Sequence, residues 1–166
     1  MKRLTSLSTS IVISLLLGSQ TSLANFEATA PKPTETTKIC KAGTVWDKDK
    51  KTCIAIKDSR FNDQDIFEHA RELAYEHRAQ DAIELLHMAQ ETNNPKILNY
   101  LGFAHRKTGN FNQAITYYSQ ALAIDPNYFL ARSYMGQGYA AEGQETLALA
   151  QLAQIRNRGG ESTWAY

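Results

Sequence analysis

Between residues 63 and 156, apolar positions recur with the spacing of amphipathic helices. The pattern predicts six helices in three consecutive pairs, separated by polar residues or glycine. The predicted helices cover residues 64–77, 80–91, 95–107, 110–123, 127–142 and 144–155. Gly109 and Gly143 lie at the turns inside the second and third pairs, where a left-handed residue commonly ends a helix. We therefore expect an all-α architecture of about six antiparallel helices in this part of the chain.

The segment before the helices, residues 38–58, has a different pattern. Two short β-prone runs, 44–46 and 52–56, flank a charged stretch that is typical of a turn, so we predict a β-hairpin. Cys40 and Cys53 lie on either side, and in an oxidising compartment two cysteines most simply form one disulfide. The chain-entropy model gives such a bridge about 3 kcal/mol. A redox pair is disfavoured because the spacing is not C-x-x-C, and a zinc site because no further ligands lie nearby.

The N-terminus has the three parts of a secretory signal, which we assign to residues 1–24. Lys2 and Arg3 precede an apolar run at 11–17, and small residues lead up to Ala24. We expect cleavage after Ala24 and a periplasmic or secreted protein with no membrane span after cleavage. The alternative is an uncleaved anchor, although the apolar run is about half of the roughly 20 residues that a spanning helix needs.

Two further segments lie outside the predicted hairpin and helices. Residues 25–37 contain two prolines and four threonines and are expected to form a flexible tether. Residues 157–166 form a C-terminal tail that is too short to cap the last helix pair. Either Trp164 and Tyr166 fold back onto the apolar side of the last helix, or this side is a surface for a homodimer or another partner.

The pattern of the second helix pair returns in the third pair with a constant offset of 34 residues. Gly102 returns as Gly136, and Ala114 returns as Ala148. A two-helix unit with this period resembles the tetratricopeptide repeat. The resemblance covers three repeats, at 63–94, 95–128 and 129–156, and the middle one has most of the family pattern: Leu101, Gly102, Gly109, Ala114, Tyr118, Ala121 and Pro126.

This resemblance implies a helical solenoid of three repeats, preceded by the disulfide-bridged hairpin, which could cover the first helix. The order of export signal, cysteine pair and repeats is also similar to that of small exported tetratricopeptide proteins of Gram-negative bacteria. Members of the family are scaffolds that bind other proteins, so the resemblance implies a non-catalytic protein with a protein or peptide partner.

In the family, the first helices of successive pairs line a concave groove that holds an extended peptide. The same register in this chain gives Gln64, Phe67, Arg71, Tyr75, Lys96, Asn99, Phe103, Arg106, Lys107, Leu130, Ser133, Gln137 and Ala141. The set combines basic and aromatic residues with no acid, which predicts an acidic and apolar partner segment. The alternative is that the bases only keep the surface soluble. One subtype of the family binds the C-terminal carboxylate of its partner through lysines in the groove. This chain has Phe67 and Leu130 at those positions, so we do not expect it to recognise a C-terminal carboxylate in this way.

The hairpin suggests a different function, the binding of envelope glycans. The pattern formed by Cys40, Gly43, Trp46, Asp47 and Cys53 resembles the last hairpin of peritrophin-type chitin-binding modules, which implies a carbohydrate contact at Trp46. The family module has six cysteines, whereas this chain has two. The alternative is that Trp46 packs on its own hairpin or on the first helix.

The remaining sequence contains no motif that points to catalysis. It has no glycine-rich phosphate loop, nucleophile elbow or H-E-x-x-H motif, so we expect neither an enzyme nor a cofactor. His69 and His77 are two helical turns apart, and a metal would need further ligands from elsewhere, so we expect no metal site. The formal net charge of +1 gives no overall signature of nucleic-acid binding.

Overall fold

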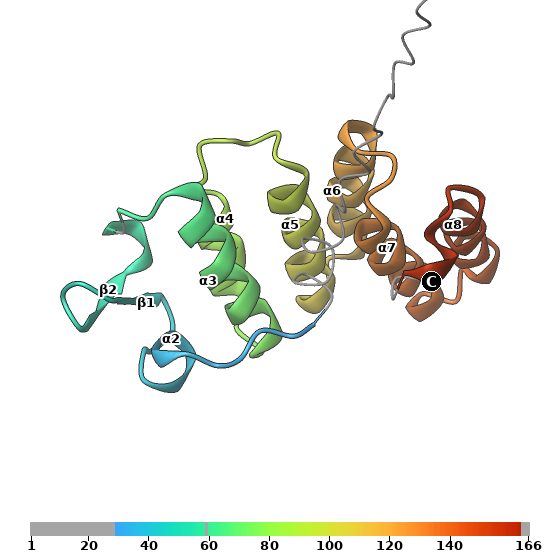
Figure 1. The fold of residues 1–166 in the computed structure, drawn as a ribbon. Helices are drawn as coiled ribbons and strands as arrows, with labels where there is room; N and C mark the ends of the chain where they lie inside the picture. Colours follow the sequence, from blue (N-terminus) through green and yellow to red (C-terminus); the bar gives the residue numbers. More distant parts are fainter. Residues whose placement is uncertain (1–28, 59, 164–166) are drawn as a thin grey trace, which may run out of the picture.

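The computed structural model describes residues 29–58 and 60–163, which form three consecutive helix pairs (Figure 1). Each first helix packs against the second helix of its pair, and that second helix packs against the first helix of the next pair. This arrangement confirms the predicted helical architecture. The pairs are α3 (Asp63–Tyr75) with α4 (Ala79–Leu86), α5 (Pro95–Lys107) with α6 (Phe111–Ile124), and α7 (Phe129–Ala141) with α8 (Glu145–Asn157). The largest difference in bounds is at α4, which ends at Leu86 and not at residue 91.

Local sequence signals set the helix ends and the turns inside the pairs. The Asn94 side chain accepts a hydrogen bond from the backbone N of Lys96 at 3.0 Å, so α5 begins directly after this cap. Gly109 and Gly143 have φ values of 82° and 70°, as the turns require. In the first pair the equivalent turn residue is His77, which takes φ 62° although it has a side chain.

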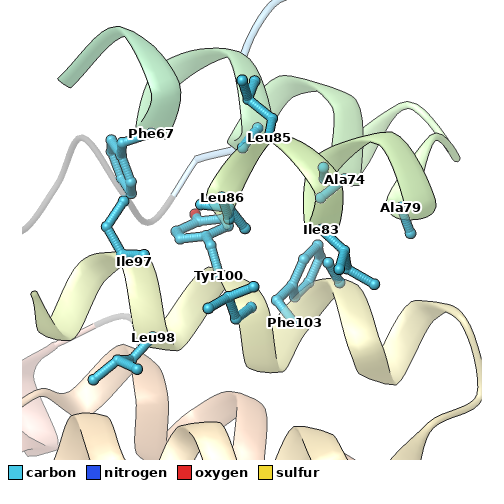
Figure 2. Packing of buried hydrophobic residues seen from close by; sticks show 14 of the residues in the cluster. Phe67, Ala74, Ala79, Ile83, Leu85, Leu86, Ile97, Leu98, Tyr100 and Phe103 are labelled. Atoms are coloured by element: carbon cyan, nitrogen blue, oxygen red, sulfur yellow. The ribbon is translucent and has the colours of Figure 1, made fainter. Parts of the chain in front are cut away.

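A continuous apolar core runs through the helix pairs. Residues from α3, α4 and α5, among them Phe67, Leu86 and Tyr100, interlock in its first part (Figure 2). In the second pair, a methyl group built on Gly102 would lie 2.7 Å from ring carbons of the buried Tyr118. The close approach of α5 and α6 therefore needs glycine at this position.

The N-terminal end of the stack is covered by the predicted hairpin. β1 (Thr44–Asp47) and β2 (Thr52–Ala55) pair antiparallel, with Trp46 opposite Cys53, and Cys40 and Cys53 form the disulfide. Val45 on β1 and Ile56, in the short 3₁₀ helix Ile56–Asp58, are buried in the same core as α3 and α4. The hairpin and the helices thus share one core.

The prediction of a flexible tether is wrong over residues 29–37. α2 (Glu35–Lys38) forms here, with Thr34 as its N-cap, and Thr36 is completely buried. The threonine hydroxyls have fixed partners, because Thr34 and Thr37 donate to the buried Glu72 carboxylate at 2.7–2.9 Å. A composition typical of a linker is thus ordered by polar contacts with α3.

The C-terminal tail folds back after α8 into a short 3₁₀ helix, Gly160–Ser162. Gly160 is buried against Ile155 of α8 and Phe129 of α7. The predictions for residues 1–24, for Trp164 and for Tyr166 lie outside the described part of the chain.

Candidate functional site

The first helices of the three pairs, α3, α5 and α7, bring aromatic residues into one cluster. The Phe103 ring centre lies 5.1 Å from that of Tyr75 and 4.8 Å from that of Tyr134. Phe67 meets Tyr100 edge to face at 5.3 Å. These ring contacts join α3 to α5 and α5 to α7, so they fix the relative positions of the three helices.

Hydrogen bonds between polar ends of these side chains run through the cluster. Arg71 Nε donates to the Tyr100 hydroxyl at 3.0 Å, and the hydroxyls of Tyr75 and Tyr134 are 2.6 Å apart. Burial raises the pKa of Tyr134 well above its usual range, and the neighbouring tyrosines raise it further. The Tyr134 phenol therefore stays protonated at physiological pH and acts as a hydrogen-bonding group.

Basic side chains are held over the aromatic rings. The Lys96 ammonium lies 5.7 Å from the Phe67 ring centre, and the Lys107 ammonium lies 5.4 Å from that of Phe103. The Arg106 guanidinium lies 5.4 Å from Phe103 and 5.9 Å from Tyr134. Since neither α5 nor α7 contains an acidic residue, positive charge predominates along these two helices.

The predicted groove residues divide by exposure. Five of them are buried and hold α3, α5 and α7 together: Phe67, Arg71, Asn99, Phe103 and Leu130. Tyr75, Lys96, Arg106 and Ser133 are half-buried, and Gln64, Lys107, Gln137 and Ala141 are exposed. The side chains that reach solvent along α5 and α7 are therefore mainly cationic or amide-bearing. The buried rings lie beneath them.

Among the predicted groove residues that the structure describes, two polar atoms are buried without a hydrogen-bond partner. One is Asn99 Oδ1, although Nδ2 of the same side chain donates to the Tyr128 hydroxyl at 3.4 Å. The other is Arg106 Nε. The outer end of this guanidinium reaches Gln137 across the α5–α7 contact at 3.5 Å, and its aliphatic part packs against Gly138. The Arg106 side chain thus spans the α5–α7 contact and lies over the Phe103 and Tyr134 rings.

The groove register omitted two residues that are central to the cluster, Tyr100 and Tyr134. They are separated by the same offset as Gly102 and Gly136, so they hold the same position in successive repeats. This equivalence could have identified them from the sequence.

Trp46, the residue of the hairpin hypothesis, is half-buried between the hairpin and α3. It lines two adjoining cavities of about 360 and 260 Å³, together with Lys48 and His69. Charged residues surround the larger cavity, among them Asp49, Arg60 and Asp65.

Within residues 29–58 and 60–163, no three His, Cys, Asp or Glu side chains are grouped as metal ligands. His69 is buried, and its Nδ1 lies 3.2 Å from the Thr36 hydroxyl. None of the helices described is long and apolar enough to cross a membrane.

Comparison with known families identifies one repeat. Residues 95–128 match the tetratricopeptide repeat. A search of curated proteins found no match to this chain. The match spans α5, α6 and the connection to α7, so the repeat prediction is confirmed for the middle pair. For residues 63–94 and 129–156 the assignment stays a prediction.

Proposed function

We propose that this chain is a non-catalytic, exported scaffold that binds an extended segment of a partner protein along α3, α5 and α7. Tetratricopeptide repeats generally mediate contacts between proteins, and this chain contains one at 95–128. The observation that carries the proposal is the set of cations positioned over aromatic rings, in particular Arg106 and Lys107 over Phe103.

This arrangement favours a partner segment that combines acidic and apolar side chains. Arg106 can pair with a carboxylate through two parallel hydrogen bonds, and Lys107 adds a second positive charge beside it. Apolar side chains of the partner can lie against the aliphatic parts of Arg106 and Lys107, since the rings beneath them are buried. Because the attraction is electrostatic, binding weakens as the salt concentration rises.

The test reverses the charge of the groove without touching the buried rings. The variant Arg106→Glu with Lys107→Glu should lose the partners that crosslink to the wild-type chain in its native compartment. The matched control is Arg156→Glu with Arg158→Glu, which makes the same charge change on and just after α8. If the groove variant retains every partner, the groove does not bind them.

The proposed export rests on the N-terminal sequence and agrees with the Cys40–Cys53 disulfide, since such bonds persist in oxidising compartments. The mass of the protein purified from its native cells tests it. We expect a chain that begins at Asn25, and a mass that includes residues 1–24 contradicts the assignment.

A second candidate function is the binding of an envelope glycan at Trp46. The two cavities beside this indole favour it, because a sugar ring can stack on the indole while the surrounding polar groups bind its hydroxyls. The purified chain should then be retained on peptidoglycan or chitin, and Trp46→Ala should abolish retention. Equal retention of the two proteins excludes this site.

We also propose that the chain associates with a second copy through α8. Leu147 and Leu149 are 45% and 56% exposed, and no charged residue stands between Glu145 and Arg156. Sedimentation equilibrium should detect a dimer that Leu149→Glu converts to monomers. A monomeric wild-type chain contradicts this proposal.

A further inference from the structure

A segment of the chain itself already lies on α3. Residues 29–34 cross α3 without forming helix or strand on their way to α2 (Figure 1). The Arg71 guanidinium donates a hydrogen bond to the backbone carbonyl of Thr29. At the other end of the segment, the backbone N of Thr34 donates to the Glu72 carboxylate at 2.6 Å, and its hydroxyl donates at 2.8 and 2.9 Å.

The composition of this segment suits an extended occupant of a groove. Pro31 and Pro33 fix φ near the polyproline value and remove two backbone donors. Little conformational entropy is therefore lost when the segment is held. Pro31, Lys32 and Glu68 all line the 260 Å³ cavity. The segment therefore lies beside Glu68, an exposed side chain on α3.

The sign of the charge changes between the first helix pair, which includes α3, and the second, which includes α5. Residues 63–94 contain eight acidic residues and two arginines, whereas residues 95–124 contain Lys96, Arg106 and Lys107 and no acid. Arg71 is the one lysine or arginine on α3, and it already binds Thr29 and Tyr100. An acidic partner segment would thus meet exposed acids such as Glu68 along α3 and bases along α5.

We propose that residues 29–34 are a built-in occupant of the α3 end of the groove and confine the partner to α5 and α7. This inference rests on the proposed function and narrows it. The partner contributes a short acidic segment that contacts the Arg106, Lys107 and Gln137 side chains. It does not continue onto α3, where the chain supplies its own backbone carbonyl to Arg71.

Site-specific photocrosslinking in the full chain tests the inference. Benzoylphenylalanine is placed either at Glu68 on α3 or at Gln137 on α7, both of which are exposed. We expect the probe at residue 68 to form an intramolecular adduct with the peptide that contains residues 29–34. The probe at 137 should give adducts with a partner peptide rich in Asp and Glu, several-fold more abundant than those from 68.

A third protein has residues 29–33 replaced by Gly-Ser-Gly-Ser-Gly, so that Thr34 and α2 are kept. Its probe at residue 68 should give a several-fold gain in partner adducts. Partner adducts of equal yield from 68 and 137 in the original chain, or no gain after replacement, overturn the inference and leave the groove function standing. The absence of partner adducts from both positions in all proteins overturns the groove function itself.

Discussion

The two ends of the helix stack are finished in different ways. At the N-terminal end, the hairpin and α2 cover α3 and α4, and Val45 and Ile56 enter the common core. At the C-terminal end, α8 buries one residue, Ile155, while Leu147 and Leu149 remain exposed. The first end is therefore closed by the chain itself, whereas the part of the chain that the structure describes leaves the second end open.

The difference shows how a very small module can close a solenoid. A two-stranded hairpin is marginal by itself, so it depends on connections to its support. Arg78, in the α3–α4 turn, supplies most of these connections. It pairs with Asp81 and donates to four backbone carbonyls at 2.8–3.0 Å, those of Thr36, Cys40, Lys41 and Thr44. The Cys40–Cys53 disulfide then closes the hairpin onto the loop that Arg78 holds.

The largest effect that we predict comes from removing this connection. Arg78→Ala leaves several carbonyls without their charged donor and should lower the free energy of unfolding by about 3 kcal/mol. The control is Arg158→Ala near the open end, whose side chain bonds only exposed groups and should change stability by less than about 0.5 kcal/mol. Urea unfolding of both variants checks the prediction. Equal losses would mean that the two ends are not held differently.

The second prediction concerns a tightly packed point at the open end, Gly160. A methyl group at Gly160 would lie 2.6 Å from Ile155 Cγ2 and 3.0 Å from the Ile155 carbonyl oxygen. Gly160→Ala should therefore destabilise the protein by about 2 kcal/mol. At Gly136 the nearest atom would be 3.4 Å away, and Gly136→Ala should be close to neutral in thermal unfolding. If Gly160→Ala is neutral as well, the tail is not anchored on α8.

The third prediction reverses the comparison, because it finds strain at the closed end. His77 takes φ 62° in the α3–α4 turn, where the α7–α8 turn has Gly143. His77→Gly should stabilise the protein by about 1 kcal/mol, since glycine adopts this conformation without a steric penalty. Gly143→Ala should destabilise it by a similar amount. Thermal melts of the two variants should shift in opposite directions, and shifts of the same sign contradict the argument.

The smallest predicted effect is a pH dependence that belongs to the closed end. The Thr36 hydroxyl accepts from the Trp46 backbone N at 3.1 Å and is therefore placed to donate to His69 Nδ1. Burial lowers the pKa of His69, and this outweighs Glu72, Asp65 and Glu68, which raise it; Lys48 lowers it further. The unfolded chain binds the proton more readily, so stability should fall as pH drops below about 6.5.

The melting temperature of the wild-type chain and of His69→Gln between pH 7.5 and 5.5 measures this contribution. The His69→Gln variant should lose less stability over this interval. The exposed His87→Gln should behave as the wild type does. If the melting temperature of His69→Gln falls with decreasing pH as steeply as that of the wild-type chain, proton uptake at His69 does not destabilise the closed end.

Much of the helical part could be predicted because its signals are local. Asn94 before Pro95 marked the start of α5, and the glycines at 109 and 143 marked the turns, since each acts on its immediate neighbours. The hairpin and its disulfide were also predictable from two β-prone runs between two cysteines. The predicted groove register includes Phe103 and Arg106, but it omits Tyr100 and Tyr134, which pack against the Phe103 ring.

The segment at 29–37 was mispredicted for a physical reason. Its prolines and threonines have little apolar surface to bury, and composition alone makes such a stretch a linker. Its order comes from Glu72, His69 and Arg78, which lie far along the chain, on α3 and in the turn that follows it. No short window of sequence contains both halves of these hydrogen bonds.

The sequence by itself determined the helix pairs, the recurrence of the second pair in the third, and the hairpin. These follow from side-chain periodicity and turn chemistry within each segment. Only the tertiary structure decided which of the predicted groove residues became buried, that an N-terminal segment lies across α3, and that one end of the stack is closed. These features depend on contacts between distant segments, and such contacts exist only once the helices have packed.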